Sequence, residues 1–162
     1  MKIHHTAGGL ALYFERAEGE LLVQLLGDTA DAMQSGALDA DDPVHQRLFP
    51  TAYRDDADAE QAFRELTESA LRDERIERAE RCTAEVAAAR TRRRGLEVVL
   101  DDEGAERWMR ALNDVRLALG TRLEITEDDD HDIDPDDPNA GARMAYGWLT
   151  MVQDGLVRAL LP

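Results

Sequence analysis

The chain has 162 residues, of which 43% are hydrophobic and 33% are charged, and its formal net charge is −16. A chain of this length can bury a core without disulfides or metals, and this composition excludes disorder throughout and a membrane-spanning segment. The N-terminal residues lack the apolar run of a secretory signal. We therefore expect a single domain over residues 1–162, located in the cytoplasm.

The first predicted elements are a short strand and a long helix. Apolar residues alternate over residues 10–14, which is the period-two pattern of a half-buried strand. A helix follows over about 18–34, because its apolar residues recur at helical spacing and Gly36 then provides a stop. A turn-rich connection leads to the string LFPTAYRDD at 48–56.

The second predicted helix spans about 57–93, is capped by Asp55 or Asp56, and carries two apolar stripes. The first stripe is Phe63, Leu66 and Ala70, and the second is Ile76, Ala79, Cys82, Val86 and Ala89. The shift between them predicts a bend or a change of packing partner near Arg72. Gly95 is expected to end the helix as a left-handed cap residue.

A second strand at 96–100 is the natural partner of the first. Asp101 caps a third helix, and a fourth helix begins near Gly141. The predicted order is therefore strand, helix, helix, strand, helix, helix. This is a mostly α fold of the α+β class, in which four main helices pack on a small two-stranded sheet.

An acidic segment at 127–140 is predicted to be an exposed loop, because two prolines interrupt it. Asp128, Asp130 and Asp132 match the first three ligand positions of an EF-hand loop, but Ile133 stands where that loop needs glycine. We expect a solvated loop without a metal site, and weak binding of a divalent ion is the alternative.

Catalytic motifs are not recognisable in the sequence. It holds no nucleophile elbow, phosphate-binding loop or dinucleotide fingerprint, so we expect a protein that is not an enzyme and needs no cofactor. Cys82 is the single cysteine. Its position on an apolar stripe predicts a core residue, while the nearby Arg78 and Arg81 favour the alternative of a redox-active thiolate.

Four arginines lie close together at the predicted end of the second helix: Arg90, Arg92, Arg93 and Arg94. Cations in a last turn interact favourably with the exposed carbonyls of a helix, and contact with nucleic-acid phosphate is the alternative. Upstream, three pairs have the favourable i,i+4 orientation: Glu68–Arg72, Glu74–Arg78 and Glu77–Arg81.

Three strings together resemble the actinobacterial AosR-like family: LFPTAYRDDADAEQAFREL at 48–66, WMRALNDVRLALGTRLEITED at 108–128, and YGWLTMVQDGLVRAL at 146–160. The resemblance implies transcriptional regulation in oxidative stress, together with RNA polymerase and an alternative sigma factor. Redox sensing in this family is tied to cysteine chemistry. With Cys82 alone, a sensing member must use an intermolecular bond, a mixed disulfide or a sulfenic acid, or has lost sensing.

Polar residues in or beside these strings have a structural and a functional interpretation. Asn113 and Arg116 are suited to tie helices together by hydrogen bonds, and Tyr53 and Arg47 to anchor the long connection on the core. The alternative is a partner-binding surface, for which the candidates are Arg116, Arg122, Tyr53 and Asn113.

The leading functional hypothesis is a non-enzymatic regulatory interaction module that contacts RNA polymerase or a sigma factor, as the resemblance implies. A chain with a negative net charge is poorly suited to bind the DNA backbone without a partner protein, which favours a function through protein contact. The alternatives are a direct DNA-binding regulator that uses Arg90–Arg94, or a structural or adaptor protein. Homo-oligomerisation is left open by the sequence.

Overall fold

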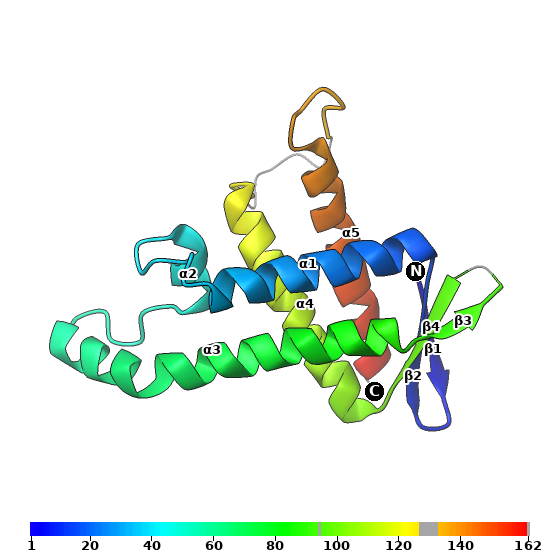
Figure 1. Cartoon of the computed structure of the whole chain (residues 1–162), viewed down its shortest axis with the longest axis horizontal. Helices are drawn as coiled ribbons and strands as arrows, with labels where there is room; N and C mark the ends of the chain where they lie inside the picture. The colour runs from blue at the N-terminus through cyan, green and yellow to red at the C-terminus, as the bar shows by residue number, and fades with distance from the viewer. Residues whose placement is uncertain (94, 127–132, 162) are drawn as a thin grey trace.

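A computed structural model describes residues 1–93, 95–126 and 133–161 of the chain. Four antiparallel strands form a sheet at one end of the molecule (Figure 1). The strands are β1 (Lys2–Thr6), β2 (Gly9–Phe14), β3 (Arg90–Arg92) and β4 (Gly95–Leu100). Their spatial order is β1-β2-β4-β3. The predicted two-stranded sheet is therefore wrong in number, although the two predicted strands are the central pair β2 and β4.

Both missed strands lie at the edges of the sheet. β1 has one large apolar residue, Ile3, and β3 consists of Arg90, Thr91 and Arg92. Neither shows apolar alternation, because an edge strand is held by backbone pairing and can carry charged side chains. The order of elements is ββαααββαα, which corrects the predicted βααβαα.

The helices are α1 (Arg16–Gln34), α2 (Pro43–Leu48), α3 (Ala57–Ala87), α4 (Asp102–Arg122) and α5 (Ala140–Leu160). As predicted, Asp56 and Asp101 cap α3 and α4, since each carboxylate accepts a hydrogen bond from a backbone N–H of the first turn. The short helix α2 was not predicted, because six residues show no apolar period. Asp42 caps it by accepting from the N–H of Val44 at 2.7 Å.

The end of α3 differs from the prediction. The helix ends at Ala87 instead of continuing to residue 93, and Gly95 begins β4 instead of capping a helix. A Cβ atom on Gly95 would lie 1.9 Å from the carbonyl oxygen of Phe14. Glycine at this position therefore serves the close approach of β4 to β2.

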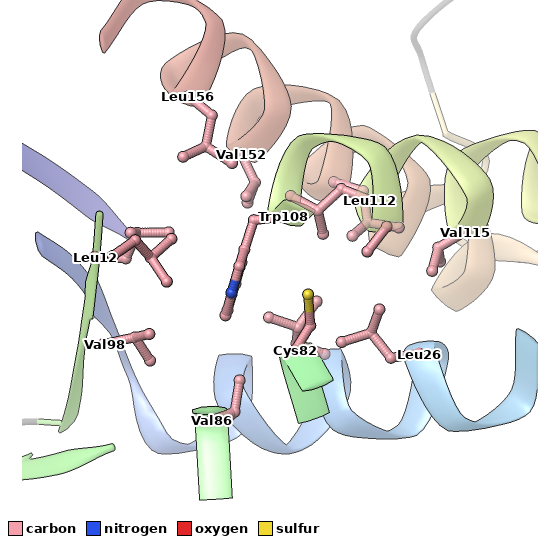
Figure 2. Packing of buried hydrophobic residues seen from close by; sticks show 14 of the residues in the cluster. Leu12, Leu26, Cys82, Val86, Val98, Trp108, Leu112, Val115, Val152 and Leu156 are labelled. Carbon is pink, nitrogen blue, oxygen red and sulfur yellow. The ribbon is translucent and has the colours of Figure 1, made fainter. Parts of the chain in front are cut away.

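The core lies between the inner face of the sheet and the helices. Leu12 and Val98 project from the sheet toward Trp108 of α4, which is completely buried (Figure 2). The rings of Phe14 and Trp108 stack with centroids 5.8 Å apart. Helices α1 and α3 run side by side across the helices α4 and α5 (Figure 1). One face of α4 and one face of α5 are apolar and buried in this core.

The two predicted stripes of α3 have different surroundings. Ala79, Cys82 and Val86 of the second stripe are buried. Phe63 and Leu66 of the first stripe are exposed, because the N-terminal half of α3 extends beyond the other helices, away from the sheet (Figure 1). The shift between the stripes thus marks where α3 leaves the body of the protein.

The predicted acidic loop at 127–140 is described only in part. Residues 127–132, which include Asp128, Asp130 and Asp132, lie outside the described residues. Residues 133–139 form turns that lead into α5. There the carboxylate of Asp137 accepts a hydrogen bond from Arg143 at 3.0 Å.

Candidate partner-binding surface

An exposed apolar surface lies on the N-terminal half of α3 and the segment before it. We call it the α3 apolar surface, and it consists of Tyr53, Ala62, Phe63, Leu66 and Ala70. Leu66 is 83% exposed, Tyr53 49% and Phe63 36%. Contiguous exposed apolar side chains mark interaction sites more often than isolated ones do. This surface is therefore the best candidate for contact with another protein.

Hydrogen bonds to the backbone of Ala52 and Tyr53 fix the position of Tyr53 in this surface. The carboxylate of Glu60, in the first turn of α3, accepts hydrogen bonds from the backbone N–H groups of Ala52 and Tyr53, each at 2.9 Å. The N–H of Tyr53 is the main cause that keeps the pKa of Glu60 below its usual value. The ring of Tyr53 then meets Phe63 edge to face, with centroids 5.8 Å apart.

The segment before Tyr53 is fixed by arginines of α3. Arg64 bonds to Glu60 at 2.6 Å and to the carbonyl oxygen of Phe49 at 3.3 Å. Arg72 and Arg75 lie over the buried ring of Phe49, with guanidinium carbons 5.5 and 5.4 Å from its centroid. The connection is thus anchored by Phe49 and the arginines of α3. The predicted anchors, Arg47 and Tyr53, are both exposed.

A buried ion cluster joins α3 to α4. The carboxylate of Asp114 is 5% exposed and accepts hydrogen bonds from Arg75 and from Arg78, the latter at 2.9 Å. Arg75 also donates to the carbonyl oxygen of Leu48 at 2.9 Å, which ties in the end of α2. This cluster fixes the direction in which α3 leaves the body. The sequence does not predict this cluster, because its one local signal is an acid, Asp114, next to apolar residues of α4.

The four predicted partner-binding residues do not form one site. Arg116 donates to Gln153 and lies over the ring of Tyr146, so it joins α4 to α5 as its structural interpretation predicts. Arg122 pairs with Asp42 at 2.8 Å and joins the end of α4 to the start of α2.

Asn113 is half-buried on α4, and Tyr53 alone lies on the α3 apolar surface. Three of its five residues, Phe63, Leu66 and Ala70, form the first predicted apolar stripe of the second helix.

The arginine-rich segment has a different position from the one predicted. Arg90 and Arg92 are exposed on the edge strand β3, and Arg93 lies in the turn that follows it. Arg94 lies outside the described residues. Arg90, Arg92 and Arg93 therefore do not form the last turn of a helix, because α3 ends at Ala87. The three predicted i,i+4 pairs upstream are all confirmed, with distances of 2.7 to 2.8 Å.

Cys82 lies in the core, 1% exposed, with its side chain directed toward Trp108, Leu112 and Leu26 (Figure 2). Burial raises the pKa of its thiol to about 12, with a further contribution from Glu85. Glu85 in turn accepts hydrogen bonds from the indole N–H of Trp108 and from Arg107. A neutral buried thiol is a poor nucleophile, so this conformation favours the core interpretation over the redox one.

Within residues 1–93, 95–126 and 133–161, no three His, Cys, Asp or Glu side chains stand together as a metal site. None of the helices in the same part of the chain combines the length and apolar character that a bilayer span requires.

The chain belongs to the family described as Domain of unknown function (DUF2017), whose pattern matches residues 1–160. It is similar to the oxidative stress regulator AosR of Mycobacterium tuberculosis and of Mycobacterium bovis, with 32% identity over 129 residues. That match covers 74% of this chain and 59% of each relative. A putative oxidative stress regulator AosR of Mycobacterium leprae is 30% identical over 169 residues, which is 98% of this chain and 77% of that relative. No solved structure matches the chain significantly.

Proposed function

We propose that this protein is a non-enzymatic regulator of the oxidative-stress response that acts in the cytoplasm by binding a protein partner through the α3 apolar surface. The observation that carries the regulatory role is the similarity to relatives named oxidative stress regulators. The resemblance described above adds that the partner is RNA polymerase or an alternative sigma factor, and that the output is transcription.

The exposed stripe supports contact with a protein. Leu66 has most of its surface in water, and complete burial of a leucine side chain contributes about 1.5 to 3 kcal/mol. Aromatic side chains such as Tyr53 and Phe63 are enriched among the residues that dominate binding at protein interfaces. The surface thus combines an aliphatic anchor with two rings that already contact each other.

The rim of the α3 apolar surface is acidic. Glu65 and Asp73 are exposed on α3 beside Leu66 and Ala70. A partner that fits this rim carries an apolar ridge flanked by lysine or arginine, because complementary charge speeds association and excludes like-charged partners. A second copy of this chain fits less well, since its own net charge is −16.

Co-purification at native expression level tests this function. Recovery of RNA polymerase and sigma factors is quantified by mass spectrometry for the wild type, for Leu66→Ser, and for Met151→Ser as a matched control. Met151 is an exposed residue of α5, at 66%. We expect Leu66→Ser to weaken binding by about 10-fold to 100-fold and Met151→Ser to leave it unchanged.

Two results would contradict the proposal in different ways. Recovery of neither RNA polymerase nor a sigma factor with the wild type would show that the partner is wrong. Equal recovery with the Leu66→Ser variant and the wild type would show that the surface is wrong.

A further inference from the structure

Positive charge is concentrated in the two segments that form the sheet. Residues 1–14 and 88–100 hold five lysines or arginines and one acid, whereas the whole chain has a net charge of −16. The five cations are Lys2, Arg90, Arg92, Arg93 and Arg94. These two segments are therefore cationic in an otherwise strongly acidic protein, and the sheet lies at the opposite end of the molecule from the α3 apolar surface (Figure 1).

The pairing register places these cations on one face of the sheet. Lys2 pairs with Tyr13, Tyr13 with Glu97, and Glu97 with Arg90. Residues directly opposite one another on neighbouring strands share a face, so this row crosses all four strands and ends in a cation at each edge. His4 and Arg92 lie two residues from Lys2 and Arg90 and share the face.

This face is the one turned away from the helices. The adjacent residues Ile3, Leu12 and Val98 point to the opposite side, where they pack in the core. We call the outer side the open sheet face, and its members are Lys2, His4, Tyr13, Arg90, Arg92 and Val99. Tyr13 is half-buried and the other five are exposed, whereas Ala11 and Glu97, which the register places on the same face, are buried beneath the longer side chains.

An aromatic pair is held at the centre of the open sheet face. The hydroxyl of Tyr13 donates to the carboxylate of Glu97, which also accepts from Arg92 and is itself 5% exposed. His4 meets the ring of Tyr13 edge to face, with centroids 5.5 Å apart. The ring of Tyr13 is thereby fixed in place before any ligand arrives.

A cleft of about 450 Å³ adjoins this aromatic pair, and its lining includes Lys2, His4, Tyr13 and Arg92. This volume lies in the range of pockets that hold small organic groups. Glu15 and Glu18 also line the cleft. The carboxylate of Glu18 accepts from the indole N–H of Trp148 at 3.1 Å, so it already has a partner within the chain.

We propose that the open sheet face binds single-stranded nucleic acid, with the cations at both edges contacting phosphates and a base stacking on Tyr13. A fixed ring between cations is the arrangement by which sheets hold unpaired bases. An acidic peptide would use the cations but has no need of the ring. A duplex hides its bases from such a flat face, and its groove requires a protruding element.

Fluorescence anisotropy with a labelled oligothymidylate of about 12 nucleotides tests this proposal. Three phosphate contacts, by Lys2, Arg90 and Arg92, predict a slope of log affinity against log salt of about −2. Binding should therefore weaken roughly 20-fold between about 50 and 200 mM salt. Absence of binding at the lower salt concentration would overturn the proposal.

Charge variants locate the contact on the open sheet face. Lys2→Ala with Arg90→Ala should reduce the magnitude of the salt slope by about 1.4. Arg81→Ala with Arg110→Ala removes the same charge from exposed helical positions and should leave the slope unchanged. An equal loss in both double variants would overturn the assignment to this face.

Ring variants separate stacking from charge. Tyr13→Leu should weaken binding by about 5-fold to 150-fold, while Tyr13→Phe keeps the ring and should bind nearly as well as the wild type. Circular dichroism confirms that both variants are folded. Equal binding by folded Tyr13→Leu would refute stacking. Two results would refute the choice of ligand. One is that poly-glutamate competes as well as unlabelled single strand does. The other is that a duplex of the same length binds as tightly as the single strand.

Discussion

Treatment of the folded protein with iodoacetamide at pH 8 measures how far the core protects Cys82. An ordinary thiol is about one quarter thiolate at this pH. A pKa of about 12 leaves only about one molecule in 10,000 ionised, and the thiolate is the species that reacts. Ionisation alone should therefore slow alkylation of Cys82 roughly 2,000-fold relative to glutathione.

Reaction through transient unfolding leads to a similar expectation. If the free energy of unfolding is about 5 kcal/mol, about one molecule in 5,000 is open at any time, and in that state the thiol ionises normally. A more stable protein would react more slowly still by this route. Both routes thus predict that alkylation of the folded protein is at least about 1,000-fold slower than that of a free thiol.

Time-resolved mass measurement provides the assay, with glutathione in the same tube as the reference. The same protein in concentrated urea is the control, and there Cys82 should react at the rate of a free thiol. Modification of the folded protein within about 10-fold of the glutathione rate would refute the argument from burial. A covalent dimer in mild peroxide would equally contradict it and would support sensing by this thiol. Slow reaction without a dimer would assign oxidant sensing to a partner protein.

Two further predictions concern buried or paired carboxylates. Asp114→Asn should lower the free energy of unfolding by about 2 to 4 kcal/mol, because Arg75 and Arg78 lose their shared counter-charge in a largely buried setting. Urea denaturation measures this loss, and a value below about 0.5 kcal/mol would contradict the prediction. The hydroxyl of Tyr13 is the main cause that holds the pKa of Glu97 below its usual value. The ionised carboxylate of Glu97 therefore stabilises the folded protein fully at pH values above the ordinary glutamate pKa. This stabilisation is lost as the pH falls through the lower pKa of Glu97 in the folded state. Denaturation at several pH values should show a shallower loss of stability in acid for Glu97→Gln than for the wild type, and identical pH dependence in both would exclude this contribution.

Local patterns predicted the elements that depend on local interactions. The caps Asp56 and Asp101 and the three i,i+4 ion pairs of α3 follow from contacts within one or two turns of helix, and all are present. The central strands β2 and β4 follow from the alternation that a buried sheet face imposes. The edge strands lack that alternation, so their pairing could not be predicted from apolar period alone.

The candidate surface could not be predicted because an apolar period does not say whether a packing partner exists. Phe63 and Leu66 have the same helical spacing as Ala79 and Cys82, yet only the latter pair is buried. What separates them is where the body of the protein ends along α3. In the same way, the ion cluster at Asp114 depends on contacts across 36 and 39 positions in the sequence, which no local window contains.

The uninterrupted course of α3 has a mechanical consequence. Its 31 residues span about 46 Å, and about 14 Å of this length separates Leu66 from Arg75, which is held by Asp114 of α4. A rotation of about 5° at Arg75 would displace Leu66 by about 1 Å. A rearrangement of the ion cluster at Asp114 would therefore change the position of the exposed end of the helix.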